Sequence, residues 1–256
     1  MLEVIDHPIE TPGGNIRELR FARPPVNALN TELLRALTAA LEGASQEAAV
    51  VVTGQPGMFS AGLDVRALLA LDRDGAITLF IELLRTQRAV AFAPVPVIFG
   101  ITGHCPAGGT VLALHGDYRV MASGDFRLGL NEVQVGLFPG PLIFGAFRRL
   151  VGGHAAQLAT RGALIDPAAA LRIGLVDELC DAPQVAARAL EMAREFCALP
   201  REMMLKTRAD ARADLHALFG NPSHALLQER DFAAKAADAW FAPVTQDRLR
   251  KLFAKK

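Results

Sequence analysis

Short apolar runs alternate with one amphipathic segment over the first fifty residues of the chain. Leu2 to Asp6 and Asn15 to Phe21 are expected to form two strands joined by a turn at residues 11–14. Residues 48–53 form a continuous run rich in β-branched side chains, which is typical of a strand buried on both faces. Between them, Asn30 is placed to cap a helix. The apolar positions of this helix recur at helical spacing on one face: Leu33, Leu34, Leu37 and Leu41.

The middle of the chain repeats the order strand, strand, helix. We predict a strand at Val95 to Thr102, an apolar helix at Thr110 to Leu114, and further strands at Tyr118 to Ala122 and Phe126 to Leu128. From Gly140 onward the pattern becomes predominantly helical. These elements predict an α/β fold built from repeated β-β-α units.

Composition changes near Pro183, where helices rich in alanine and arginine begin and no further strand is evident. We therefore divide the chain into a core at residues 1–182 and a C-terminal helical region at residues 183–256. A chain of 256 residues with 51% hydrophobic residues can bury a substantial core.

Charge and targeting signals exclude several classes of function. The formal net charge is zero and the pI is about 7.0, so no global field attracts nucleic acid or an anionic membrane. The N-terminal residues show neither a signal peptide nor a transit leader, and no long uncharged apolar stretch follows. Three cysteines without Cys-x-x-Cys spacing favour a reducing compartment: Cys105, Cys180 and Cys197. We expect a soluble, cytoplasmic protein.

Two glycine-containing runs, residues 59–64 (FSAGLD) and 103–109 (GHCPAGG), carry the first chemical signal. Glycine allows bare backbone N–H groups to approach a ligand closely, and two N–H groups converging on one oxygen form an oxyanion hole. Gly108 is expected in the first turn of a helix, where its N–H has no partner within the helix and the helix dipole favours negative charge. Small residues also permit close packing of a helix on a strand, which is the alternative for either run alone.

The two runs, with residues 128–136 (LGLNEVQVG), resemble the crotonase family, also called the enoyl-CoA hydratase/isomerase superfamily. Residues 21–29 (FARPPVNAL) and 170–177 (ALRIGLVD) are similar to two other family motifs, so the resemblance covers nearly the whole chain. Within the family, the motifs are most similar to the Δ3,Δ2-enoyl-CoA isomerases of the mitochondrial type.

The resemblance implies a crotonase-like spiral with the CoA and acyl site in residues 1–182. It implies that residues 183–256 serve trimerisation, giving a homotrimer or a dimer of trimers. The backbone N–H groups of Leu63 and Gly108 would be the two oxyanion donors. The resemblance also places a further group around substrate and CoA, with the Ser60 and Ala61 backbones near the adenine: Ser60, Ala61, Gly62, Asp64 and Asn131. Asp64 would mainly fix the loop as a helix cap.

Glu132 is our candidate for the group that carries a proton. Leu128, Leu130, Val133 and Val135 surround it in sequence, and partial desolvation of a carboxyl raises its pKa. A base with a pKa near the working pH is better matched to a weakly acidic carbon. The sequence alone leaves open a solvent-facing glutamate that caps a short helix, but the match to the family motif Leu-Asn-Glu favours catalysis.

The chain departs from the hydratases at Val111, where the resemblance places a second catalytic glutamate in those enzymes. Valine cannot help to activate water, whereas one glutamate suffices to move a proton from C2 to C4 of a 3-enoyl thioester. We therefore expect a Δ3,Δ2-enoyl-CoA isomerase acting in fatty acid β-oxidation. The alternatives are another acyl-CoA enzyme of this fold, namely a hydratase, hydrolase or decarboxylase, or a non-catalytic RNA-binding or scaffold relative.

No cofactor is expected, because coenzyme A enters as part of the substrate thioester. The six histidines show no ligand spacing, so we predict no metal site. The segment from Leu71 to Phe92 is expected to flank the acyl chain. The apolar residues of this segment include Leu79, Phe80, Leu83 and Leu84. The sequence does not show which of them line a pocket, so it does not predict the acyl chain length.

Overall fold

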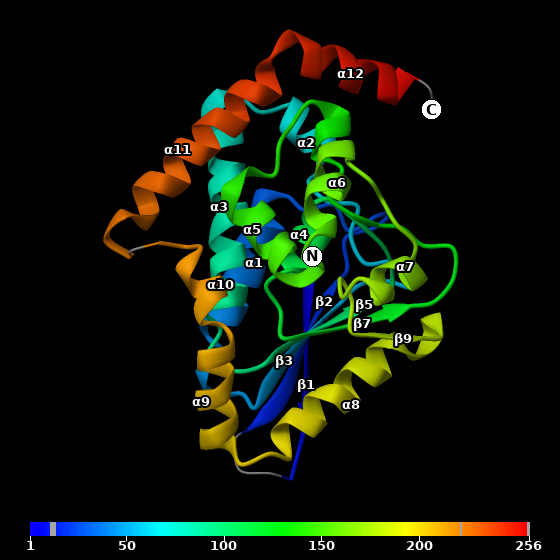
Figure 1. Cartoon of the computed structure of the whole chain (residues 1–256), viewed down its shortest axis with the longest axis vertical. Helices are drawn as coiled ribbons and strands as arrows, with labels where there is room; N and C mark the ends of the chain where they lie inside the picture. Colours follow the sequence, from blue (N-terminus) through cyan, green and yellow to red (C-terminus); the bar gives the residue numbers. More distant parts are fainter. Residues whose placement is uncertain (11–13, 221, 255–256) are drawn as a thin grey trace.

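The computed structural model describes residues 1–10, 14–220 and 222–254, with side chains described outside 221–228 and 250–256. The predicted turn at residues 11–14 therefore lies largely outside the described residues. The large sheet has six strands in the order β1-β2-β3-β5-β7-β9 (Figure 1). β1 and β2 are antiparallel, and all later neighbours are parallel. The strands are β1 (Leu2–Pro8), β2 (Asn15–Phe21), β3 (Ala49–Thr53), β5 (Val97–Ile101), β7 (Tyr118–Ala122) and β9 (Glu178–Cys180).

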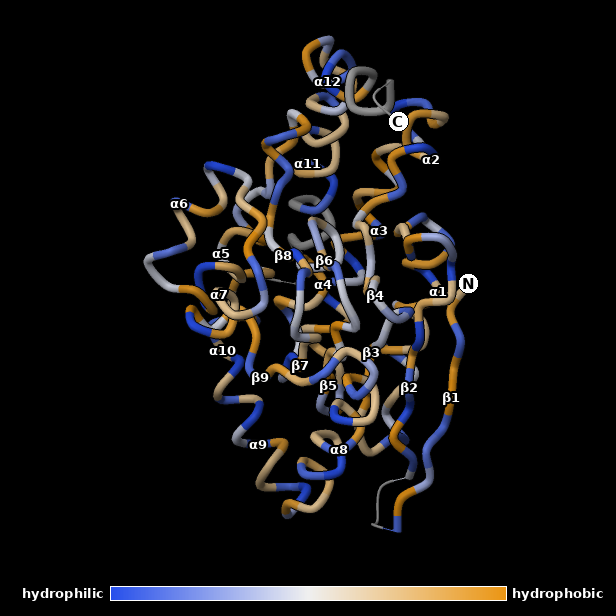
Figure 2. Tube along the Cα trace, turned by 90° about the vertical axis from the view of Figure 1, so that its right-hand side faces the viewer, coloured by the Kyte–Doolittle hydropathy of each residue, from blue (hydrophilic) through white to orange (hydrophobic). Residues whose placement is uncertain are grey.

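A smaller sheet of three parallel strands lies above the large one in Figure 2. Its strands are β4 (Gly57–Met58), β6 (Gly103–Pro106) and β8 (Leu128–Gly129). Each follows a strand of the large sheet and precedes a helical segment, so the strand-strand-helix repeat predicted from the sequence is present. The predicted strand at Val95 to Thr102 is shorter than expected, and only Leu128 of the predicted strand at Phe126 to Leu128 forms β8.

Buried side chains of the first helices share one apolar cluster with side chains of β2, β3, β5 and β7. Asn30 caps α1, because its Oδ1 accepts the N–H of Leu33 at 2.9 Å. The four predicted leucines of α1 are buried in the larger of two apolar clusters. These helices are α1 (Thr31–Glu42), α2 (Val65–Leu69), α3 (Arg73–Ala91) and α4 (Gly108–Ala113).

The helices of the second half surround this core. α8 covers the opposite face of the large sheet, where Val185 and Ala189 join Val51 and Ile98 in the smaller apolar cluster. α11 runs along α3 (Figure 1). The helices are α5 (Gly140–Val151), α6 (His154–Arg161), α7 (Pro167–Arg172), α8 (Val185–Cys197), α9 (Arg201–Ala211), α10 (Ala213–Ala217), α11 (Pro222–Phe241) and α12 (Pro243–Ala254).

In the described part of the chain after residue 182, every secondary-structure element is a helix. Its division from the core as a trimerisation region stays a prediction, and α8 lies directly on the core sheet. Among the helices that the structure describes, none combines the length and the apolar character needed to cross a membrane.

Candidate active site

The two glycine runs meet because β4 and β6 are parallel neighbours. Gly57 pairs with Gly103 and Met58 with His104, so the segments that follow both strands emerge at the same edge of the small sheet. The N–H of Phe59 donates to the carbonyl of His104 at 3.0 Å and extends this pairing. The sheet thereby brings together two segments that lie more than forty residues apart in the sequence.

Gly62 and Gly108 allow these segments to touch. Gly62 has a φ of +84°, and a Cβ added there would lie 3.0 Å from the nitrogen of Gly108. A Cβ added at Gly108 would lie 3.3 Å from the nitrogen of Leu63. The N–H groups of Leu63 and Gly108 therefore lie next to each other, and neither donates a hydrogen bond to any residue that the structure describes. This is the arrangement that an oxyanion hole needs.

Ala107, which precedes Gly108, has a backbone conformation that alanine rarely adopts, with φ of +48° and ψ of −120°. Its neighbours hold it there. The N–H of Ala107 donates to the carbonyl of Gly129 at 2.9 Å, and its carbonyl accepts the N–H of Val111 at 2.8 Å. Thr110 adds a further tie, because its hydroxyl donates to the carbonyl of Cys105 and accepts the N–H of Gly129. The turn that presents the Gly108 N–H is thus fixed from both sides.

Glu132 begins a short 3-10 segment, Glu132–Val135, after β8. Its carboxyl atom Oε2 is buried and has no hydrogen-bond partner among the described residues. Burial raises the pKa of Glu132 to about 7, although a hydrogen bond from its own backbone N–H acts in the opposite direction. The side chain is therefore poised to exchange a proton near neutral pH.

One cavity of about 220 Å³ joins these groups. Leu63, Gly108 and Glu132 all line it, and so does Val111, the position at which the hydratases were expected to carry a second glutamate. Among the described residues, Glu132 is the single acidic or basic side chain in the lining. The rest of the wall is mainly apolar.

The other predicted site residues divide into two groups. Ala61 and Asn131 line the cavity, whereas Ser60, Gly62 and Asp64 do not. Ser60 is fully buried, where its hydroxyl donates to the carbonyl of Asn27 at 2.8 Å and accepts the N–H of Gly62. Its side chain supports the loop from beneath, and contacts between this loop and CoA stay a prediction.

Asp64 acts as a structural residue of the loop. Its carboxylate accepts the N–H of Ala67 at 2.9 Å, capping α2, and forms an ion pair with Arg23 at 2.6 Å. Burial opposes ionisation, but the Ala67 N–H and the Arg23 guanidinium outweigh it and hold the pKa of Asp64 below its ordinary value. Asp64 and Glu132 are therefore shifted in opposite directions, and Glu132 alone is suited to carry a proton near neutral pH.

The C-terminal helix α11 supplies part of the wall that the sequence analysis missed. Phe232, Ala236 and Trp240 are spaced by four residues, lie on one face of α11 and line the cavity. This four-residue spacing can be read from the sequence, but it does not show which cavity this face of α11 lines. On α3, Phe80 and Leu83 line the cavity, while Leu79 and Leu84 do not.

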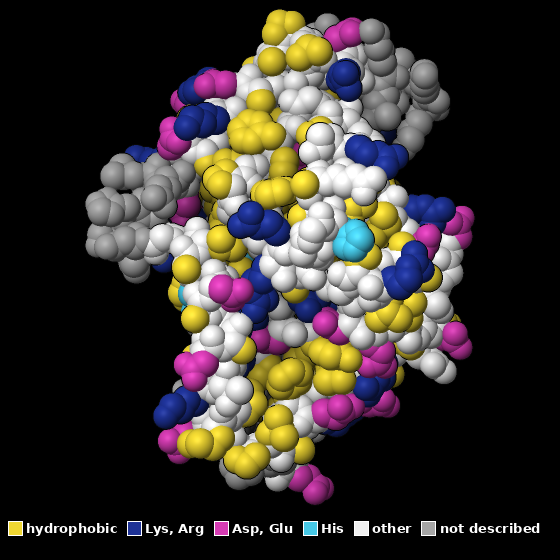
Figure 3. Space-filling model, in the orientation of Figure 1, with side chains coloured by type: hydrophobic (Ala, Val, Ile, Leu, Met, Phe, Trp, Pro, Cys, Tyr) yellow, Lys and Arg dark blue, Asp and Glu magenta, His cyan; other side chains and the backbone are white. Residues whose placement is uncertain are grey.

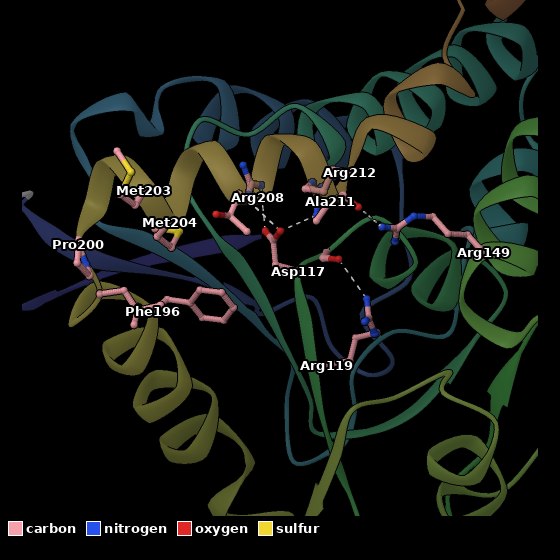
Figure 4. Close-up of a pocket in the computed structure, with 13 residues that line it drawn as sticks. Asp117, Arg119, Arg149, Phe196, Pro200, Met203, Met204, Arg208, Ala211 and Arg212 are labelled. Atoms are coloured by element: carbon pink, nitrogen blue, oxygen red, sulfur yellow. Dashed lines mark hydrogen bonds and ion pairs between the residues drawn. The ribbon is translucent and has the colours of Figure 1, made fainter.

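A second cavity, of about 500 Å³, lies beside α8 and α9 and contains four arginines and Asp117 (Figure 4). Figure 3 shows charged side chains gathered in the middle of the same face, above a group of apolar side chains. Arg208 bonds both carboxylate oxygens of Asp117 at 2.8 and 2.9 Å, and Arg212 bonds Oδ1 at 2.7 Å. Arg212 also donates to the carbonyl of His115 at 2.7 Å. These contacts tie α9 and α10 to the start of β7, so the cluster serves as an anchor.

Within the described ranges 1–10, 14–220 and 222–254, no three histidine, cysteine, aspartate or glutamate side chains are grouped so as to hold a metal ion.

Residues 11–224 match the family model described as enoyl-CoA hydratase/isomerase. Human mitochondrial enoyl-CoA delta isomerase 1 is 30% identical over 206 residues, which cover 78% of this chain and 68% of the human protein. A probable enoyl-CoA hydratase, EchA17 of Mycobacterium avium (strain 104), is 34% identical over 209 residues, covering 80% of this chain and 79% of the relative. The crystal structure of human mitochondrial delta3-delta2-enoyl-CoA isomerase has a TM-score of 0.86 at 27% identity and covers 99% of each chain.

Proposed function

Because the chain belongs to the enoyl-CoA hydratase/isomerase family, we propose that it is a Δ3,Δ2-enoyl-CoA isomerase. Its substrate would be a 3-enoyl-CoA, and its product the conjugated 2-trans-enoyl-CoA. The family and the crotonase fold, both predicted from the motifs, are confirmed.

A single observation carries the choice of isomerisation over hydration. Glu132 is the one carboxylate among the described residues that line the cavity, and Val111 occupies the position where a second would be needed. Addition of water to a double bond requires the water to be oriented and activated, as well as a proton to be delivered to carbon. A double-bond shift needs only removal and return of one proton, which one carboxylate can do.

The proposed reaction begins with ionised Glu132 removing a proton from C2 of the 3-enoyl thioester. The electron pair of the C2–H bond moves onto the thioester oxygen and gives a dienolate, and Glu132 becomes protonated. Glu132 then returns the proton to C4, the double bond forms between C2 and C3, and the carboxylate is regenerated.

The dienolate oxygen would accept the N–H groups of Leu63 and Gly108. The two donors are adjacent and have no partner among the described residues, so they need no rearrangement as negative charge develops. Gly108 is the first residue of α4, which adds the positive end of a short helix dipole. One such donor is worth about 3 kcal/mol of transition-state stabilisation in comparable sites.

The same proposal includes CoA binding near Ser60 and Ala61, and assembly into a homotrimer or dimer of trimers through residues 183–256. Sedimentation of the purified protein tests the assembly. A monomer at micromolar concentration would contradict that part of the proposal.

The test of the reaction is incubation with 3-trans-hexenoyl-CoA while 2-trans-hexenoyl-CoA and 3-hydroxyhexanoyl-CoA are both measured. We expect the 2-enoyl product in wild type and its loss in Glu132→Gln, with the variant still folded. Wild-type turnover by Glu132→Gln would refute the assignment of the proton to this residue. Because the EchA17 relative is a probable enoyl-CoA hydratase, hydration is the alternative result. Hydration would be detected as 3-hydroxyhexanoyl-CoA.

A further inference from the structure

A third cavity, of about 480 Å³, adjoins the candidate active site. Phe138 and Phe232 line both it and the active-site cavity. The two rings are 5.7 Å apart and nearly perpendicular, with an interplanar angle of 77°. These two aromatic side chains therefore form a partition between the cavities.

The two rings are held differently. A Cβ added at Gly140 would lie 2.1 Å from Cε2 of Phe232, so the Phe232 ring packs directly on the Gly140 backbone and is fixed between α11 and the start of α5. Phe138 lies between the 3-10 segment of Glu132 and α5, and 38% of its surface is exposed. Phe138 is therefore the ring that can move.

The third cavity has the chemistry of a site for an alkyl chain. Apolar side chains from α3, the start of α5 and the turn after α10 form most of the wall that the structure describes: Leu84, Pro141, Leu142, Leu218 and Phe219. Its polar members come from α11. Asp231 and Lys235 are exposed and form an ion pair with each other at 2.6 Å. The half-buried Glu229 adds a carboxyl whose pKa is raised by burial, so the described lining offers no unpaired positive charge to an anionic ligand. An apolar ligand entering from the active site would bury surface here.

We propose that this third cavity receives the distal end of a long acyl chain and that Phe138 is the residue that determines chain length. A short chain ends within the first cavity, whereas a longer one must displace the Phe138 ring to continue between α3, α5 and α11. The inference rests on the proposed function for the identity of the ligand, since it takes that ligand to be an acyl-CoA.

The experiment compares kcat/KM for 3-trans-hexenoyl-CoA and 3-trans-dodecenoyl-CoA in wild type, Phe138→Ala and Phe241→Ala. Phe241 is the matched control, because it is a phenylalanine with 39% exposure on α11 that lines neither cavity. We expect Phe138→Ala to raise the ratio of the twelve-carbon to the six-carbon value about tenfold, which is the effect of a small change in an apolar pocket. The ratio in Phe241→Ala should equal that of wild type. An unchanged ratio in Phe138→Ala would overturn the inference.

Leu142→Trp supplies a variant with the opposite effect. Leu142 lines the third cavity and not the first, so an indole there should fill the space beyond the partition and lower the same ratio. Thermal melting of each variant separates a misfolded protein from a change in selectivity. A ratio that falls in both variants, or rises in both, would contradict the proposed role of the partition.

A binding measurement separates failure of this inference from failure of the proposed function. Trp240 is the single tryptophan of the chain and lines the first cavity, so its fluorescence can report the binding of hexanoyl-CoA and dodecanoyl-CoA. If neither 3-enoyl-CoA is turned over but Phe138→Ala selectively tightens dodecanoyl-CoA, the inference stands and the isomerase proposal falls. If isomerisation occurs but Phe138→Ala leaves the chain-length selectivity unchanged, the isomerase proposal stands and the inference falls. Absence of acyl-CoA binding would overturn both.

Discussion

Glu132 combines an ionisable carboxyl with surroundings that disfavour its charge. Its Oε2 atom has no partner among the described residues, in contrast to Asp64, which is held ionised by Arg23 and the Ala67 N–H. The two carboxyls are 68 residues apart in the sequence: Asp64 follows β4 and caps α2, whereas Glu132 follows β8. Their environments separate a proton carrier from a structural anion.

The raised pKa of Glu132 predicts the pH dependence of the reaction. Because the carboxylate must be ionised to accept the C2 proton, kcat/KM should be level above about pH 7 and fall about tenfold per pH unit below it. The profile of the free enzyme is measured at subsaturating 3-trans-hexenoyl-CoA. A rate that remains constant down to pH 5 would show that the working base has an ordinary carboxyl pKa.

The same raised pKa predicts that ionised Glu132 destabilises the folded protein. The pKa of Glu132 is about 7 in the folded protein and near 4.5 when unperturbed, so the folded state binds more protons between these pH values and loses stability as pH rises through this window. Glu132→Gln should therefore stabilise the protein by about 3 kcal/mol at pH 8 and have little effect at pH 4.5. Urea denaturation at both pH values measures the difference. A pH-independent effect would contradict the burial of this charge.

Substitutions at Leu63 test the role of its backbone N–H separately from that of its side chain. Leu63→Pro removes the N–H and should lower kcat about 100-fold or more, since that is the range for loss of one oxyanion donor. Leu63→Ala keeps the N–H and is the control for the lost side chain. The measurement is kcat on 3-trans-hexenoyl-CoA, with melting temperature to verify folding. Equal losses in both variants would assign the effect to the side chain.

The sequence pointed to the proposed catalytic residues more directly than to the pocket around them. Leu63, Gly108 and Glu132 stand in short motifs, where spacing and residue type both carry information. Trp240 and Phe138 have no comparable local signal, because their roles depend on how α11 lies against α3 and α5. Contacts between distant helices are fixed by packing of whole faces, which a single sequence does not determine.

At the scale of elements, the long strands were predictable and the short ones were not. β3 is rich in β-branched apolar side chains and β7 ends in three apolar residues, and α1 shows a clear helical period with a capping asparagine. β4 and β8 have two residues each, too few to show any alternation. Yet β4, paired with the four-residue β6, brings the two proposed oxyanion donors together, so a strand too short to predict helps to position the candidate site.

The anchor of α9 and α10 gives a prediction at this scale. Asp117→Asn would leave the buried guanidinium groups of Arg208 and Arg212 without a counter-charge and should destabilise the fold by about 3 kcal/mol or more. The control is Asp231→Asn, which breaks an exposed pair with Lys235 and should cost below about 0.5 kcal/mol. Chemical denaturation of both variants provides the comparison. Equal, small effects would show that Asp117 does not anchor these helices.

At the scale of the whole molecule, the C-terminal region completes the wall of the cavity whose proposed catalytic groups come from the core. The donors and Glu132 come from residues before 140, whereas α11 contributes Phe232, Ala236 and Trp240 to the same wall. Composition correctly indicated that this region is helical, but not that it completes the cavity. The sequence therefore predicted the family and most of the order of elements, whereas the shape of the pocket depends on how the last helices pack.

The most direct test of a single-carboxylate isomerase is to supply 2-trans-hexenoyl-CoA and measure its hydration against isomerisation of 3-trans-hexenoyl-CoA by the same preparation. With Glu132 as the one carboxylate in the described lining, which also includes Val111, we predict rapid isomerisation. We predict no 3-hydroxyhexanoyl-CoA above the rate in buffer. Hydration at a rate comparable to isomerisation would contradict this account and require a second group that activates water.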